Sequence, residues 1–326
     1  MQLTTVWFVL IAMLWAGYFV LEGFDFGVGV VLPFLARDEA ERRAVAESIR
    51  PVWDGNEVWF LGAGAATFAA FPAWYATLFS GFRLPLLLIL AAVIIRMAAL
   101  AYHRGSDGAR GWDRAFFWAS LIPSFLWGAA FANIVHGVPL DVGHAYRGSP
   151  LTLVNPYALL GGAATLVLFA LYGAVFLALR TEGELRAAAA RAARRLGLVA
   201  LVVVGAFLVT TELDSGKPVT WLTAAMAVMA VAAALVATVR RRDGWAFAAN
   251  AAAIVAVTAT LFMNLWPNVM PALDPANTLT VYDASSTPYT LSVLTWVAGI
   301  LTPVVLTYQA WTCWVFRKRL TAGRGA

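Results

Sequence analysis

Five ionisable residues stand in strongly apolar surroundings in the first third of the sequence. Glu22 and Asp25 occupy one apolar stretch, Asp54 and Glu57 open the next, and Arg96 lies within a third. Placing such a side chain inside a membrane span costs about 2.5 to 3.5 kcal/mol on insertion scales, and spans retain these groups mainly where they function. These five residues are therefore the first candidates for chemistry.

The spacing of the acids places each pair on one helix face. Glu22 and Asp25 are three residues apart, as are Asp54 and Glu57, and residues three apart are neighbours on a helix surface. With alternating span directions, all five groups fall in the same half of the membrane. Four carboxyls then face one guanidinium, Arg96. The surplus must reach water or bind protons, which predicts a protonatable cluster.

Simpler roles remain open for two of these residues. Asp54 is on the first turn of its predicted helix, where a carboxylate also stabilises the positive end of the helix dipole. Arg96 can act as a structural counter-ion that holds three helices together. The sequence alone does not choose between these roles and direct participation in proton transfer.

The composition defines the class of protein that must position these groups. Of 326 residues, 61% are hydrophobic and 13% are charged, whereas a soluble domain is about a quarter charged. A soluble globule is excluded, and the first basic residue, Arg37, comes too late for a cleaved signal peptide. The excess of basic residues then reports membrane orientation and does not indicate binding to nucleic acid.

Nine apolar stretches are long enough to cross a bilayer as helices, which needs about 20 residues each. The predicted fold is all-α, a single transmembrane domain over 1–326. The predicted spans lie near 7–35, 53–79, 82–102, 115–136, 156–180, 196–213, 219–239, 244–266 and 289–316.

The basic residues predict the orientation of these spans. Of 23 Lys and Arg residues, 19 follow odd-numbered spans or lie in the C-terminal tail, and three follow even-numbered spans. By the positive-inside rule the N-terminus is outside and the C-terminus is cytoplasmic. The inner connections 36–51 and 181–195 are expected to form short charged surface helices, and the outer connections 137–155 and 267–288 to form loops.

Glycines beside the acids are expected to pack helices closely. Gly23, Gly27 and Gly29 surround Asp25, and a second small-residue run contains Gly62 and Gly64. Small residues let the backbones of membrane helices approach each other. No strand precedes them, so a nucleotide-binding role is not favoured.

Ligands for a metal or a haem are scarce. The three histidines, His103, His136 and His144, lie at span ends or in a loop, and Cys313 is the single cysteine. A membrane protein that binds haem usually supplies His, Met or Cys as axial ligands. The sequence therefore predicts no metal site and no haem on this chain, and an intramolecular disulfide is impossible.

Several segments together resemble one family. These are Glu22–Gly29 (EGFDFGVG), Pro51–Trp59 (PVWDGNEVW), Phe79–Phe82 (FSGF), and Leu279–Ser286 (LTVYDASS) followed by Leu291–Trp296. In order and along the whole chain they resemble subunit II of the cytochrome bd-type quinol oxidases, a family that includes cyanide-insensitive oxidases.

The resemblance implies a bacterial cell-membrane heterodimer. In this family a partner, subunit I, carries two b-type haems, one d-type haem and the quinol site, and the complex reduces O₂ to water with cytoplasmic protons. The family's proton path maps onto Asp25 and Asp54. The spacing of the ionisable residues adds Glu22 and Glu57 to this path and Arg96 as a structural counter-ion. Some members have glutamine in place of Glu57. Small accessory subunits, membrane lipid and a structural quinone are further possible partners.

Two other functions compete with this interpretation. A proton-coupled secondary transporter could bind its coupling ion at the same carboxyls, but such transporters usually show repeated halves, and the later spans do not repeat these acids. A purely structural assembly subunit would tolerate neutralisation of the acids.

Overall fold

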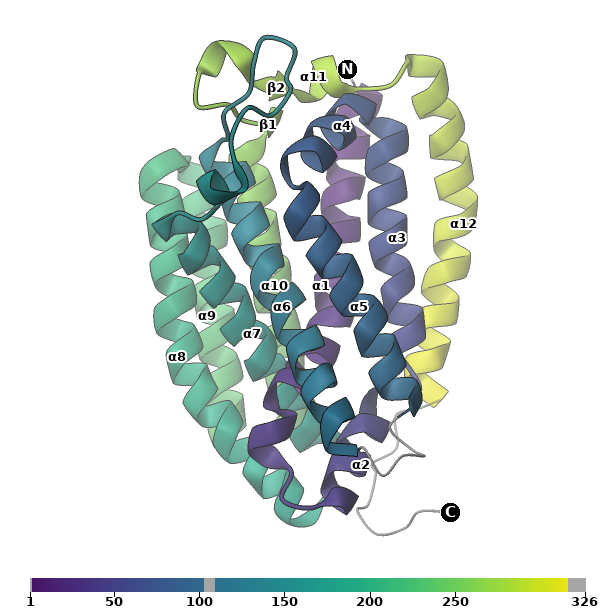
Figure 1. Ribbon diagram of the computed structural model, residues 1–326, viewed down its shortest axis with the longest axis vertical. Coiled ribbons are helices and arrows are strands. Elements are labelled where there is room, and N and C mark those ends of the chain that lie inside the picture. Colours follow the sequence, from purple (N-terminus) through teal and green to yellow (C-terminus); the bar gives the residue numbers. More distant parts are fainter. Residues whose placement is uncertain (1, 103–108, 316–326) are drawn as a thin grey trace.

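The computed structural model describes residues 2–102 and 109–315 as a bundle of long helices (Figure 1). Its α-helices are α1 (Gln2–Leu35), α2 (Glu39–Ile49), α3 (Trp53–Ala70), α4 (Pro72–Gly81), α5 (Arg83–Tyr102), α6 (Ala109–His136), α7 (Pro156–Arg180), α8 (Gly183–Ser215), α9 (Pro218–Val239), α10 (Asp243–Leu265), α11 (Val281–Ala284) and α12 (Pro288–Val315). Two 3₁₀ turns, η1 (Pro150–Leu153) and η2 (Pro275–Asn277), and two short strands, β1 (Asn268–Met270) and β2 (Leu279–Thr280), complete the described elements.

Eight of the described helices are long and apolar enough to cross a membrane. They are α1, α5, α6, α7, α8, α9, α10 and α12. The all-α membrane fold predicted from the sequence is thus confirmed, and each of these helices overlaps a predicted span. The remaining predicted span, 53–79, corresponds to α3 and α4.

The predicted span 53–79 is divided by a bend. Phe71 leaves the helical conformation, with φ −134° and ψ 69°, and Pro72 begins α4. A proline lacks the amide hydrogen for the helix ladder and disfavours the α conformation in the residue before it. The 18-residue α3 is also less apolar, because Asp54, Asn56 and Glu57 lie at its start.

The inner connection 181–195 was predicted wrongly as a separate surface helix. It is continuous with the predicted span 196–213 in the 33-residue helix α8. Its sequence is rich in Ala and Arg, which are strong helix formers, and after Gly183, where α8 begins, no Gly or Pro interrupts it before Gly197. At 1.5 Å per residue, α8 is about 50 Å long and extends beyond a 30 Å hydrocarbon layer. By contrast, α2 is the separate short helix that was expected.

Helix α7 lies at the centre of the bundle. In its most apolar 18-residue stretch, 72% of the residues are buried. It crosses α1 where glycines face each other: a Cβ on Gly27 would overlap the carbonyl oxygen of Phe169, and one on Gly173 would overlap the backbone of Gly27. The close-packing role predicted for Gly27 is confirmed. Gly62 and Gly64 differ, because no atom of the described chain lies within 4 Å of where their Cβ would stand.

The α1–α7 crossing gives a direct test of this packing. We expect Gly27→Ala to lower the midpoint of thermal unfolding, because the added methyl meets rigid backbone and overpacking costs about 1–3 kcal/mol. Gly205→Ala is the control, since its Cβ would meet open space and alanine favours a helix over glycine. Equal midpoints for the two variants in detergent would contradict the close crossing.

The connections 137–155 and 267–288 form a folded cap at one end of the bundle, above α4 (Figure 1). β1 pairs antiparallel with β2, and Val138 pairs with Ala272 from the other connection. The amide of Ala145 and the guanidinium of Arg147 hold the pKa of Asp141 below its usual range, which stabilises a turn within this cap.

Candidate functional site

Glu22, Asp25 and Arg96 form a buried ionic cluster between α1 and α5. All three residues are fully buried. The guanidinium of Arg96 donates a hydrogen bond to Oε1 of Glu22, and its second terminal nitrogen lies 3.8 Å from Oδ2 of Asp25. The ring of Phe26 lies 4.7 Å from the guanidinium carbon. The structure thus brings together three of the five residues that the sequence singled out.

Two amide side chains extend this cluster towards α12. Asn56 of α3 donates to Oδ2 of Asp25 over 2.7 Å and to the carbonyl of Leu21 over 3.0 Å. Gln309 of α12 in turn donates to Oδ1 of Asn56 over 3.0 Å. Sequence reasoning missed both residues because it considered only ionisable groups. A buried amide in an apolar span is also costly, and that signal could have identified Gln309.

Glu57 lies at the edge of the cluster and is partly buried. Its Oε1 is buried and has no hydrogen-bond partner among the residues that the structure describes, and its carboxyl interacts electrostatically with Glu22, Arg96 and Asp54. Glu57 therefore lies between the fully buried acids and the start of α3.

Asp54 is exposed on the first turn of α3 and makes no hydrogen bond or ion pair within the described chain. The residue at the N-cap position is Val52, and no side chain forms a cap hydrogen bond there. Asp54 is thus outside the buried cluster. A carboxyl so placed can exchange protons with water and also interact with Glu57.

The cluster has more carboxyls than counter-charges. Glu22, Asp25 and Glu57 face the guanidinium of Arg96, and Oε2 of Glu22, Oδ1 of Asp25 and Nε of Arg96 are buried without hydrogen-bond partners in the described part of the chain. Unsatisfied buried polar atoms are rare in proteins and often indicate bound water or a functional role. This arrangement is suited to holding a proton on one of the carboxyls.

The described histidines do not converge on a metal or haem position. Nδ1 of His136 lies 3.3 Å from Oδ2 of Asp214 near the surface, and Nδ1 of His144 lies 2.9 Å from the carbonyl of Asn277. His103 lies outside the described residues. Among the side chains that the structure describes, no group of three or more His, Cys, Asp or Glu residues could hold a metal ion. The two described histidines therefore do not form an axial haem pair.

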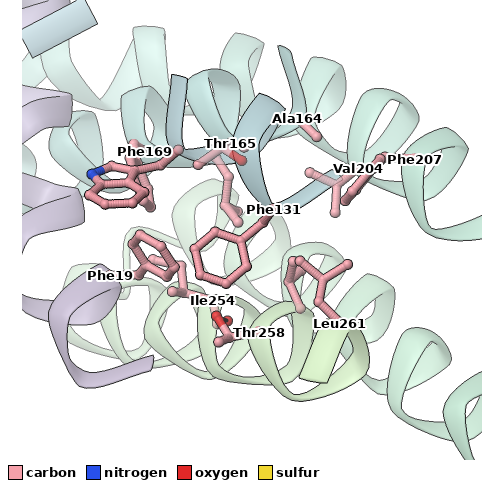
Figure 2. A pocket seen from close by; sticks show the side chains of 14 residues that line it. Phe19, Phe131, Ala164, Thr165, Phe169, Val204, Phe207, Ile254, Thr258 and Leu261 are labelled. Carbon is pink, nitrogen blue, oxygen red and sulfur yellow. Dashed lines mark hydrogen bonds between the residues drawn. The ribbon is translucent and has the colours of Figure 1, made fainter. Parts of the chain in front are cut away.

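A small apolar cavity of about 40 Å³ lies in the bundle (Figure 2), and Glu22, Asp25, Glu57 and Arg96 are not among its lining residues. Phe19, Phe131 and Phe169 line it, together with the hydroxyl-bearing Thr165 and Thr258. Both hydroxyls donate to carbonyls of their own helices, so no donor is left for a ligand. The cavity has no ionisable lining residue, and the capacity for acid–base chemistry lies in the cluster around Arg96.

The fold and the cluster together define a membrane protein of many helices with a buried acid–arginine site. The family model for cytochrome bd terminal oxidase subunit II matches residues 3–316. The chain is 38% identical to the cytochrome bd ubiquinol oxidase subunit 2 of Bacillus subtilis (strain 168), with 98% of this chain and 97% of that protein covered.

Two further comparisons agree. The chain is 32% identical to the cytochrome bd-I ubiquinol oxidase subunit 2 of Escherichia coli (strain K12), covering 97% and 94% of the two chains. A chain in the structure of bd oxidase from Geobacillus thermodenitrificans has the same fold, with a TM-score of 0.78, 18% identity, and 98% and 100% coverage. This protein belongs to the family of cytochrome bd terminal oxidase subunit II.

Proposed function

We propose that this chain is the haem-free subunit II of a quinol:O₂ oxidoreductase and that it stabilises subunit I. The observation that carries the proposal is the match of the whole chain to subunits of ubiquinol oxidases. In this proposal, haems b and d reside in the partner, as the resemblance to this family implies. When bound there, these haems supply the redox chemistry, and quinol is the electron donor of the complex.

We further propose that this chain conducts protons from one end of α3 towards the partner. Exposure gives the order of the path: Asp54 is exposed, Glu57 is partly buried, and Glu22 and Asp25 are fully buried. Asp54 takes up a proton from water and Glu57 relays it to the buried pair. Arg96 holds that pair in place and lowers the cost of a transient negative charge there.

The amides of Asn56 and Gln309 suggest where the path leads. They connect Asp25 to α12 by two consecutive hydrogen bonds. In the most apolar 18-residue stretch of α12, only 6% of the residues are buried within this chain. The exposed residues of α12 include Trp296 and Ile300. We therefore place subunit I against α12. The open sides of Gly62 and Gly64 on the neighbouring α3 fit the same interface.

The orientation is part of this proposal. The ends of α1, α7 and α9 carry most of the arginines, and the positive-inside rule assigns that end to the cytoplasm of a bacterial cell. Asp54 lies on the first turn of α3, just after the short charged helix α2. Since α2 follows the arginine-rich end of α1, the path opens on the cytoplasmic side. Proton uptake from the cytoplasm by an oxidase builds a membrane potential without a separate pump.

The transporter alternative is not favoured. The family is that of an oxidase subunit, and the ionic cluster is built from residues of α1, α3 and α5.

Expression of this chain with and without subunit I tests the proposed function. We expect the chain expressed alone to purify without haem, and the co-expressed chain to purify in a 1:1 complex that oxidises quinol and shows a d-type haem band. A stable haem spectrum from the isolated chain would contradict the haem-free assignment. Failure to co-purify with any haem-bearing subunit would contradict the oxidase assignment.

A further inference from the structure

A groove with three arginines opens on the side of the bundle between α1, α7 and α8. Its volume is about 470 Å³. Arg37, just after α1, and Arg191 and Arg195 of α8 line it, and the remaining lining residues are apolar. Arg191 and Arg195 are one helical turn apart, so they lie on the same face of α8.

The two α8 arginines are free of protein partners. Neither Arg191 nor Arg195 makes a hydrogen bond or ion pair within the described chain, and both are exposed. Arg37 is paired with Glu184 over 3.3 Å, an interaction exposed to solvent. Arg37 also contacts Glu41, whose carboxylate accepts a hydrogen bond from the backbone amide of Arg37. The groove therefore keeps an excess of positive charge.

The apolar part of the groove has the form expected for a hydrocarbon chain. Ala188 and Ala192 of α8 leave space beside the arginines, and Leu196 continues the apolar lining. Phe34 of α1 also lines the groove, although 77% of its surface is exposed within this chain. A large exposed aromatic beside a groove favours an apolar ligand over a purely ionic one.

The position of the arginines along α8 matches the level of lipid headgroups. Arg195 lies 20 residues before the end of α8 at Ser215, a distance of about 30 Å along a helix, which equals the hydrocarbon thickness of a bilayer. When the polar turn after Ser215 is at one membrane surface, Arg195 is at the opposite surface. Arg191 is one turn further into the headgroup layer, and Leu196 faces the acyl region.

We propose that this groove binds one anionic glycerophospholipid. The phosphodiester lies between Arg191, Arg195 and Arg37, and an acyl chain runs along Ala192 and Leu196. Basic pockets between membrane helices on the arginine-rich side are typical sites for acidic headgroups, and arginine suits phosphate because its guanidinium donates two parallel hydrogen bonds. The groove lies wholly within this chain, so the inference does not depend on oxidase activity.

Native mass spectrometry of the delipidated complex tests this site. We expect phosphatidylglycerol to rebind to the wild-type complex and to bind the double variant Arg191→Gln, Arg195→Gln about 30-fold more weakly, the effect of removing two cations near the headgroup. The matched control is Arg194→Gln, Arg240→Gln, which removes two exposed arginines from the same end outside the groove. It should bind phosphatidylglycerol as the wild type does.

Two further measurements distinguish a lipid from free phosphate. Ala192→Phe fills the apolar part of the groove and keeps all three arginines, so it should weaken phosphatidylglycerol binding. Inorganic phosphate should not displace the lipid, and phosphatidylcholine should bind more weakly because its headgroup has no net charge. Equal binding by the two double variants, or full displacement by inorganic phosphate, would overturn the proposal.

Discussion

Asp25→Asn is expected to reduce quinol-oxidase turnover per complex by about 10²- to 10⁴-fold, the range that positioned proton-transfer groups contribute. The amide keeps the volume of Asp25 and still accepts the hydrogen bond from Asn56, so the complex should assemble. It does not ionise at neutral pH and cannot relay a proton. The measurement is steady-state quinol oxidation normalised to the haem content of the purified complex.

Two companion variants make this result interpretable. Asp54→Asn should cause a smaller loss, because Asp54 is exposed and water can deliver protons directly to Glu57. Glu182→Gln removes an exposed carboxyl just before α8, away from the cluster, and should leave turnover unchanged. Full turnover of the Asp25→Asn complex with normal haem content would assign the proton route to the other subunit.

Arg96→Met is expected to reduce the amount of assembled complex before it affects turnover per haem. The substitution leaves Glu22 and Asp25 in the protein interior without their counter-ion, and breaking a buried ion pair costs about 3–5 kcal/mol. The yield of complex and its thermal unfolding midpoint measure the effect.

The double variant Arg96→Met, Glu22→Gln separates a charge effect from a packing effect. Glu22 accepts the direct hydrogen bond from Arg96, so neutralising it removes one of the two carboxylate charges that lose their counter-ion. Assembly should recover substantially relative to Arg96→Met alone, since directly contacting residues are energetically coupled. No recovery would indicate that Arg96 acts by filling space, and would contradict a counter-ion role.

The sequence alone was sufficient for features that depend on local chemistry. The long apolar stretches predicted the membrane helices, because each must satisfy its own backbone hydrogen bonds and reach across the hydrocarbon layer. The cost of charge in that layer singled out Glu22, Asp25 and Arg96, which the structure then placed in contact. Both signals are local, since each follows from a residue and its neighbours in the chain.

Only the tertiary structure decided how distant segments meet. The spacing of Asp54 and Glu57 suggested equivalent members of one cluster, yet the packing of α3 against α1 leaves Asp54 exposed and turns Asn56 inward to Asp25. The contact of Asn56 with Gln309 joins residues 253 positions apart, and no local pattern specifies such a pair. The groove beside Arg195 likewise depends on the continuity of α8 and on its packing against α1 and α7. Side-chain partners across helices follow from interhelical packing, which a periodic sequence pattern does not encode.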